Sequence, residues 1–223
     1  MLWLLMGPEI FILIPALILA LYAQYKVKST YAKYARIRTA KGVSAGAAAK
    51  QLLDRAGISD VKIERARRTL GDHYDPRHKV LRLSDPNSSS VAAVGVAAHE
   101  VGHAIQHAHG YQPLAVRTLM VPAANLGSQL AFPLFFAGLL FRNPLLLDIG
   151  IIAFSAAVLF TLVTLPVEFN ASSRAIGALR SSYIVSENEI GAVKRVLSAA
   201  ALTYVAAVAM AILQLLVLLA RRR

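Results

Sequence analysis

Residues 90–103 have the sequence SVAAVGVAAHEVGH, and this stretch predicts the helix on which the fold and its chemistry depend. The residues before the first histidine are small or apolar, as is typical of a buried helix. On a helix, His99 and His103 are four residues apart and project from the same face. Two neutral imidazoles at that spacing can bind one Zn²⁺, and Glu100 can accept a proton from the water that the ion activates. The alternative is a helix on which the two histidines only make hydrogen bonds.

The composition indicates a membrane protein rather than a soluble domain. The chain has 223 residues, of which 57% are hydrophobic, and its mean hydropathy is +0.54. A soluble domain of this size is less apolar. The chain has no cysteine, so any zinc must be held by His, Asp or Glu. The net charge of +12 favours contact with anionic lipid headgroups, and no nucleic-acid partner is expected because the chain has no nucleic-acid motif.

Four long and nearly uncharged segments predict transmembrane helices. They are residues 2–25, 119–141, 144–167 and 199–220. The first segment lacks the basic start and the cleavage site of a signal peptide, which predicts a retained anchor. Pro122 and Pro133 lie inside the second segment, where neighbouring helices can compensate for the interrupted backbone bonding.

The distribution of Lys and Arg predicts the topology. Residues 26–118 hold sixteen of the 24 basic residues, and residues 168–198 hold four more. The positive-inside rule therefore places both segments in the cytoplasm. The three arginines at residues 221–223 disagree, because they would lie outside if all four segments cross. Either the last segment does not fully cross the membrane, or the larger number of Lys and Arg in the other segments determines the orientation in spite of the short tail.

The segment between the first two spans predicts a small α+β domain. Ser44 and Gly57 have the residue types that begin and end a helix. Residues 61–63 and 79–83 predict short strands, and residues 72–76 predict a turn between them. A strand beside the metal helix can offer its edge to an extended peptide, or it can simply cover the helix.

A catalytic zinc normally has three protein ligands and one open position for water. Glu168 is the preferred third ligand, because an ionisable group at the membrane boundary is costly without a partner. His109 falls where the metzincin pattern places its third histidine, but that pattern needs glycine where this chain has Gln106. His107 lies one turn beyond His103, and three collinear imidazoles on a straight helix span too far to bind one ion.

Four short motifs carry a resemblance that covers most of the chain. They are YDPR at residues 74–77, LRLS at 81–84, HEVGH at 99–103 and PVEF at 166–169. In these motifs the chain resembles the YugP-like neutral zinc metallopeptidases of bacterial membranes. The last motif is also similar to the glutamate motif of the heat-shock-type membrane zinc proteases and the CAAX prenyl proteases.

The resemblance implies a zinc site whose ligands are His99, His103 and Glu168. It implies that Glu100 is the catalytic base and that the protein lies in a bacterial membrane. Together with the distribution of Lys and Arg, this predicts the bacterial inner membrane with the site facing the cytoplasm. Where the wider group has an aspartate four residues after the glutamate ligand, this chain has Ser172. The supporting role of that aspartate would then fall to Ser172 or Asn170.

These features predict a mainly α membrane protein with about four transmembrane helices and a small α+β, zincin-like cytoplasmic domain that carries HEVGH. Residues 26–118 would form the metal-site domain, and residues 168–198 would supply the third ligand. The predicted function is hydrolysis of peptide bonds in proteins or peptides, membrane proteins among them, by a zinc metalloendopeptidase. The alternative is a non-catalytic zinc-binding membrane scaffold or chaperone, for which Glu100 would be dispensable. A transporter is disfavoured because only Glu9 and Asp148 lie in or near the spans.

Overall fold

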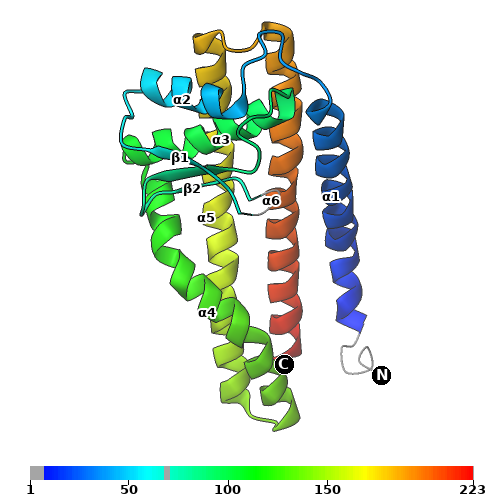
Figure 1. The fold of residues 1–223 in the computed structure, drawn as a ribbon. Coiled ribbons are helices and arrows are strands. Elements are labelled where there is room, and N and C mark those ends of the chain that lie inside the picture. Colours follow the sequence, from blue (N-terminus) through cyan, green and yellow to red (C-terminus); the bar gives the residue numbers. More distant parts are fainter. Residues whose placement is uncertain (1–7, 68–70, 223) are drawn as a thin grey trace. The chain divides into compact units, whose positions relative to one another are not determined.

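The computed structural model describes residues 8–67 and 71–222, which fold mainly into helices (Figure 1). The elements are η2 (Pro8–Leu13), α1 (Ile14–Ala35), α2 (Ala45–Arg55), β1 (Lys62–Arg65), β2 (His73–Asp75), β3 (Val80–Leu83), α3 (Val91–Ala108), α4 (Gln112–Leu140), α5 (Pro144–Ser182) and α6 (Glu187–Arg221). Residues 2–7 of the first predicted span and residue 223 lie outside the described residues. The chain forms two compact units, each assembled from segments that are distant in sequence.

The first unit comprises Tyr25–Leu114 and Val167–Ala201, and it contains the sheet with α2 and α3. Helix α2 starts where the sequence predicts, because the Ser44 hydroxyl accepts a hydrogen bond from the Ala47 N–H at 3.3 Å. Gly57 follows this helix with a φ of +71°, which lets the chain turn away. Helices α2 and α3 pack against each other, and both contact the sheet (Figure 1).

The sheet has the strand order β1-β3-β2, with β1 parallel and β2 antiparallel to β3. The strand predicted at residues 79–83 is therefore central, and both of its edges are already paired. The turn predicted at residues 72–76 is wrong in part, because His73–Asp75 forms strand β2. Three residues are too few to show a period of two, and the flanking Asp and Pro signal a turn. Within the described residues, the free strand edges belong to β1 and β2.

Helix α3 is the centre of the first unit. Its first turn is capped by Ser90, whose hydroxyl accepts a hydrogen bond from the Ala93 N–H at 3.2 Å. Its small residues allow close packing, and a Cβ at Gly95 would lie only 3.1 Å from a methyl group of Val193 in α6. The side chains fully buried around α3 include Leu52, Leu53, Leu81, Leu83 and Leu179. Segments from both halves of the chain thus share one hydrophobic core.

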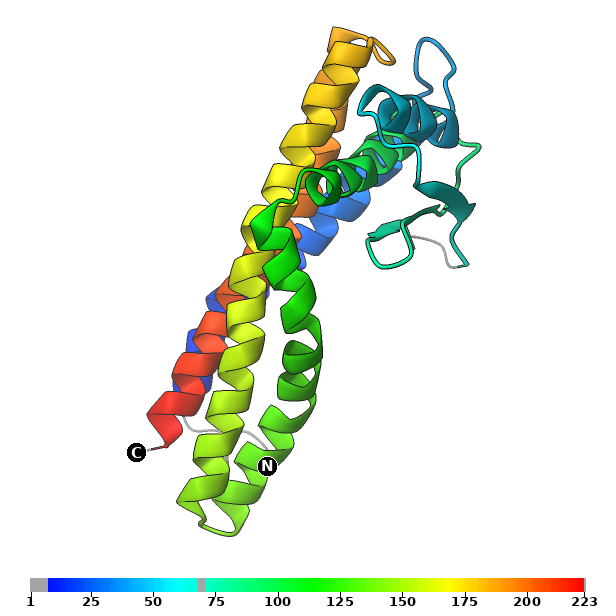
Figure 2. The same ribbon diagram turned by 90° about the vertical axis from the view of Figure 1, so that its left-hand side faces the viewer.

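The second unit comprises Met1–Gln24, Ala115–Pro166 and Leu202–Arg223. Figure 2 shows its helical hairpin, in which the short turn after α4 leads directly into α5. The two helices approach closely at glycines, since a Cβ at Gly127 would overlap the backbone oxygen of Ala153. Small residues at a helix crossing are typical of membrane bundles. A cluster of buried apolar side chains, with Phe135 and Phe154 the largest, fills the space between the helices.

An ion pair in this unit joins the end of α6 to the start of α5. The Arg222 Nε lies 2.5 Å from the Asp148 Oδ1, and a second guanidinium nitrogen lies 3.0 Å from Oδ2. The start of α5 and the end of α6 are therefore neighbours. Asp148 offsets one of the tail arginines that disagree with the predicted topology.

Among the described residues, four helices could cross a membrane by their length and composition, which is the number predicted. The helices long and apolar enough to cross a membrane are Phe11–Ala35, Gln112–Leu140, Pro144–Ser182 and Glu187–Arg221. The predicted end of the third span at residue 167 is not the end of its helix, since α5 continues to Ser182. The hydropathy of the sequence falls after residue 167, which is why the span was predicted to end there. The helix continues because Ala171, Ala175 and Leu179 keep a four-residue spacing and are fully buried.

Shortening a buried side chain of the central strand β3 should destabilise the first unit strongly. Leu81 is fully buried between α3 and its neighbours, so Leu81→Ala should lower the free energy of unfolding by about 2–5 kcal/mol. Thermal unfolding in detergent, followed by circular dichroism, measures the effect. The matched change Ile37→Ala, at a side chain that is 44% exposed, should shift the midpoint far less. Equal shifts in the two variants would contradict the assignment of Leu81 to the core.

Candidate metal centre

Three side chains from two helices converge at one point in the first unit. His99 and His103 of α3 and Glu168 of α5 each offer a ligand atom, and these atoms all lie within 4.8 Å of one another. The Glu168 Oε2 lies 3.1 Å from the His99 Nε2 and 3.6 Å from the His103 Nε2. The two imidazole rings are nearly perpendicular, at an interplanar angle of 83°. The group is largely buried, with Glu168 only 2% exposed.

This donor set fits a zinc ion. Bonds of about 2.0–2.1 Å in a tetrahedral zinc site separate the ligand atoms by about 3.3 Å, close to the distances from the glutamate to the two histidines. Three protein ligands also leave one position open, as in catalytic zinc sites. A buried carboxylate facing two imidazole nitrogens needs a positive charge between them, which a proton or a metal ion can supply.

The close approach of α3 to α5 depends on Gly102, the fourth residue of HEVGH. A Cβ at this position would overlap the backbone oxygen of Ala171 in α5. Gly102 therefore lets α3 lie directly against α5, one residue before His103. Because Glu168 lies one turn before Ala171, this contact brings the carboxylate to the histidines.

Each histidine uses its Nδ1 atom for a contact that leaves Nε2 directed at Glu168. The His99 Nδ1 lies 3.1 Å from the Ser172 Oγ, and the His103 Nδ1 lies 3.0 Å from the Gln106 Oε1. Burial opposes a charge on His103, but the hydrogen bond to Glu168 and the negative charge of Glu100 outweigh it. The pKa of His103 is therefore raised.

Glu100 follows His99 in α3 and does not belong to the converging group of three. It is only 8% exposed. Within residues 8–67 and 71–222, no hydrogen bond or ion pair joins its carboxylate to another group. A buried carboxylate without such a contact is available to exchange a proton with a bound molecule.

The alternative ligands make other contacts. The His109 Nδ1 lies 2.8 Å from the backbone oxygen of Ile105, and His109 caps the end of α3. The His107 Nδ1 lies 2.9 Å from the hydroxyl of Tyr74 in β2. Burial, with the nearby charges of Asp60 and Asp75, raises the pKa of Tyr74 to about 12, so its hydroxyl stays protonated beside His107. Neither histidine joins the group of three.

The sequence does not predict the contacts of Gln106, and it predicts those of Asn170 only in part. In the sequence, Gln106 is notable only because it stands where the metzincin pattern needs glycine. In the structure its side chain contacts His103, Asn170 and the backbone of α5. The Asn170 Oδ1 accepts hydrogen bonds from Gln106 and Arg174. The contact between Gln106 and His103 could have been predicted, because Gln106 lies three residues after His103 on the buried side of an apolar helix.

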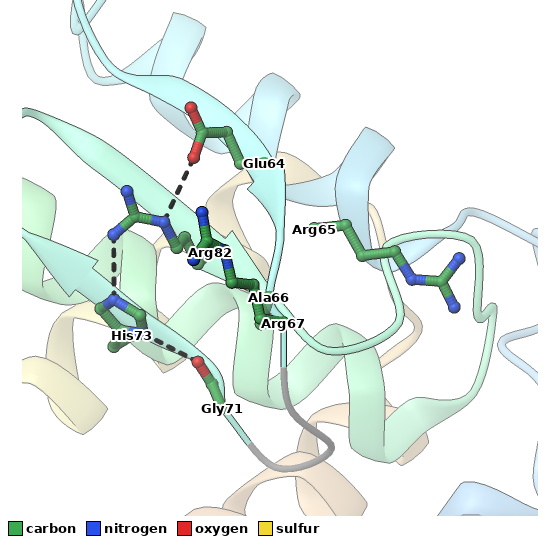
Figure 3. A pocket seen from close by; sticks show the side chains of 7 residues that line it. All are labelled: Glu64, Arg65, Ala66, Arg67, Gly71, His73 and Arg82. Carbon is green, nitrogen blue, oxygen red and sulfur yellow. Dashed lines mark hydrogen bonds and ion pairs between the residues drawn. The ribbon is translucent and has the colours of Figure 1, made fainter.

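A cavity of about 520 Å³ lies at the sheet, and its lining does not include the converging group (Figure 3). Its residues are Glu64, Arg65, Ala66, Arg67, Gly71, His73 and Arg82. The Arg82 guanidinium donates to the Glu64 carboxylate at 3.2 Å and to the His73 Nε2 at 3.2 Å. These contacts tie the three strands together through their side chains.

The fold and the converging group define a class: membrane-type helices with a buried site of two histidines and a glutamate that could hold a metal ion. A family model described as "Putative neutral zinc metallopeptidase" matches residues 9–223, and the chain belongs to this family. It is 47% identical over 209 residues to the "Putative membrane protease YugP" of Bacillus subtilis (strain 168), with 93% of each chain covered. No solved structure matches the chain. The resemblance to the YugP-like family is confirmed, and zinc is the cofactor of the family.

Adding one methyl group at the crossing should disrupt the site. Gly102→Ala must separate α3 from α5, so both the unfolding temperature and the zinc content should fall. Gly177→Ala is the matched control, because a Cβ there meets no atom within 4 Å. That variant should be stabilised by roughly 0.5–1 kcal/mol through the higher helix propensity of alanine. If Gly102→Ala matched the control in both measurements, the close contact would not be needed.

Removing the negative charge of Glu168 should weaken zinc binding. Glu168→Gln keeps the side-chain size but loses the charge, so competition with a chelator should show an affinity loss exceeding the roughly 10–100-fold cost of a change outside the ligand shell. Glu187→Gln is the control, because Glu187 is exposed and pairs with Arg180 at 3.2 Å. Unchanged zinc affinity in Glu168→Gln would rule out this carboxylate as a ligand.

Proposed function

We propose that the protein is a membrane-anchored zinc metalloendopeptidase of the HExxH type. The observation that carries this proposal is the buried carboxylate of Glu100, which has no hydrogen bond or ion pair with another described residue and whose negative charge acts on His103. In the proposal His99, His103 and Glu168 are the zinc ligands, and Glu100 is the general base. The family and the name of the Bacillus subtilis relative support a peptidase.

In the proposed hydrolysis, Glu100 transfers the proton and the three ligands hold the zinc ion. When bound, zinc supplies a Lewis acid that activates a water molecule and polarises the carbonyl of the scissile peptide bond. Glu100 accepts a proton from this water as the water oxygen attacks the carbonyl carbon. Glu100 then donates the proton to the leaving amine nitrogen, and the C–N bond breaks. The products are a carboxylic acid and an amine, and the base returns to its starting charge.

The proposed zincin-like domain corresponds to residues 26–118, with residues 168–198 contributing the third ligand. Helix α5 has 39 residues and is about 58 Å long at 1.5 Å per residue. The hydrocarbon core of a bilayer is only about 30 Å thick, so part of this helix must extend beyond it. The concentration of Lys and Arg in residues 26–118 favours a cytoplasmic active site in a bacterial inner membrane.

The proposed substrates are peptide bonds of proteins or peptides, membrane proteins among them. A site on a chain with four candidate spanning helices is held close to the bilayer, where segments of other membrane proteins emerge. The free edges of β1 and β2 offer backbone groups to an extended substrate by addition of a strand. β2 is the nearer candidate, because this strand contacts α3 and its Tyr74 binds His107.

Replacing the general base should separate catalysis from metal binding. Glu100→Gln keeps the size of the side chain but cannot accept a proton, so chelator-sensitive cleavage of casein should fall by about 10²–10⁴-fold. Zinc content should stay at the level of the parent protein. The assay uses purified protein in detergent, with metal analysis of the same samples.

The same experiment tests the alternative function, a zinc-binding scaffold or chaperone. A scaffold would bind zinc without cleaving peptides, and Glu100→Gln would leave its properties unchanged. Glu187→Gln serves again as a control for the loss of one carboxylate on the surface of the first unit. Cleavage by Glu100→Gln at the rate of the parent would exclude Glu100 as the base.

A further inference from the structure

Gln106 is a polar side chain in the interior of the first unit. It is fully buried on α3, three residues after His103. A buried amide is costly unless its polar atoms form hydrogen bonds. Its Nε2 donates to the backbone oxygen of Val167 at 2.8 Å and to the Asn170 Oδ1 at 2.9 Å, and its Oε1 lies 3.0 Å from the His103 Nδ1. The amide therefore joins a proposed zinc ligand to α5.

The orientation of this amide follows from its partners. The backbone oxygen of Val167 can only accept a hydrogen bond, so the Gln106 atom facing it must be the NH₂ group. The contact between Arg174 and Asn170 independently indicates the same orientation of the Gln106 amide. A guanidinium only donates, and the Arg174 Nε lies 2.7 Å from the Asn170 Oδ1, which makes this amide oxygen an acceptor. The same oxygen then accepts from Gln106 as well.

With both amino hydrogens of Gln106 donated to α5, the atom facing His103 must be the amide oxygen. An oxygen accepts, so the His103 Nδ1 must carry the proton. In the neutral ring Nε2 then has the lone pair, and this is the atom that faces Glu168 at 3.6 Å.

We propose that Gln106 is a positioning residue, which holds the His103 ring in the tautomer and orientation that zinc binding requires, and which is itself held by Val167, Asn170 and Arg174. The inference rests on the zinc ligands of the proposed function but not on the catalytic step. A neutral imidazole in the other tautomer would have to shift its proton before binding zinc through Nε2. Partners of this kind commonly orient metal-binding histidines.

The second histidine provides an internal comparison. The partner of the His99 Nδ1 is the Ser172 hydroxyl, at 3.1 Å. A hydroxyl can rotate to donate or to accept, so it does not select one tautomer by itself. Gln106 cannot exchange roles in this way, because turning its amide over would place its oxygen against the acceptor oxygens of Val167 and Asn170. The requirement for a fixed partner therefore falls on His103.

Two measurements test the proposal without using peptide cleavage. The first is the zinc dissociation constant, from competition with a chelator. The second is the pair of ¹⁵N shifts of the His103 ring in zinc-free protein labelled at histidine, at a pH above the pKa of the ring. These shifts distinguish a proton on Nδ1 from a proton on Nε2, and a residue that only stabilised the fold would not move them.

Gln106→Met keeps the approximate size of the side chain and removes the hydrogen bonds. It should weaken zinc binding by about 10–100-fold and give a mixture of the two tautomers. The pair Asn170→Ala and Asn170→Asp is the second test, on a partly exposed residue. Asn170→Ala removes one acceptor for Gln106 and should weaken zinc binding. Asn170→Asp keeps an acceptor for Gln106 and Arg174, and should bind zinc like the parent.

The outcomes separate this inference from the proposed function. A parent ring protonated on Nε2, or a folded Gln106→Met variant that binds zinc like the parent, would overturn the positioning role. If Gln106→Met does not fold, the Asn170 pair decides, and equal zinc affinity in its two members would overturn the role. A parent protein that binds zinc, shows the Nδ1 proton and cleaves no peptide would support the role and exclude only the peptidase.

Discussion

The contact between α3 and α5 at Gly102 is the constraint on which the site depends. Helix packing normally holds two axes 8–10 Å apart, with side chains between them. Here glycine meets the backbone of Ala171 directly, so the ligand side chains need only a short reach. His103 follows Gly102 on one helix and Glu168 precedes Ala171 by one turn on the other. The motif thus encodes a helix contact together with two residues that could hold a metal ion and the proposed base.

Charge explains why so many ionisable groups can share this interior. A zinc ion with two neutral imidazoles and the Glu168 carboxylate has a net charge of +1. In the proposed site the carboxylate of Glu100, which pairs with no other described residue, would bring the sum to zero, so that burial of the whole group would be less costly than burial of any single charge. Under this proposal Glu100 would need no cation of its own and would be free to exchange a proton.

The sequence predicts those parts of the molecule whose determinants are local. The metal helix and its Ser90 cap follow from an apolar run, a capping residue and a histidine spacing, and the four apolar helices follow from hydropathy. Glu168 was predicted as a ligand because a carboxylate at a membrane boundary needs a partner.

The remaining features depend on contacts that are distant in sequence. Strand β2 is three residues long and exists because it pairs with β3. The extension of α5 beyond residue 167 is stabilised by the core around α3, which hydropathy alone does not register. The role of Gln106 becomes visible only when α5 is in place, since two of its three hydrogen-bond partners belong to that helix.

The order of the ligands along the chain has a consequence for biosynthesis. The hairpin of α4 and the first part of α5 separates HEVGH from Glu168. A ribosome therefore makes both histidines well before the glutamate, and a growing chain lacks the complete ligand set until the whole hairpin has been synthesised. The proposed hydrolase would therefore stay inactive in nascent chains that end before residue 168.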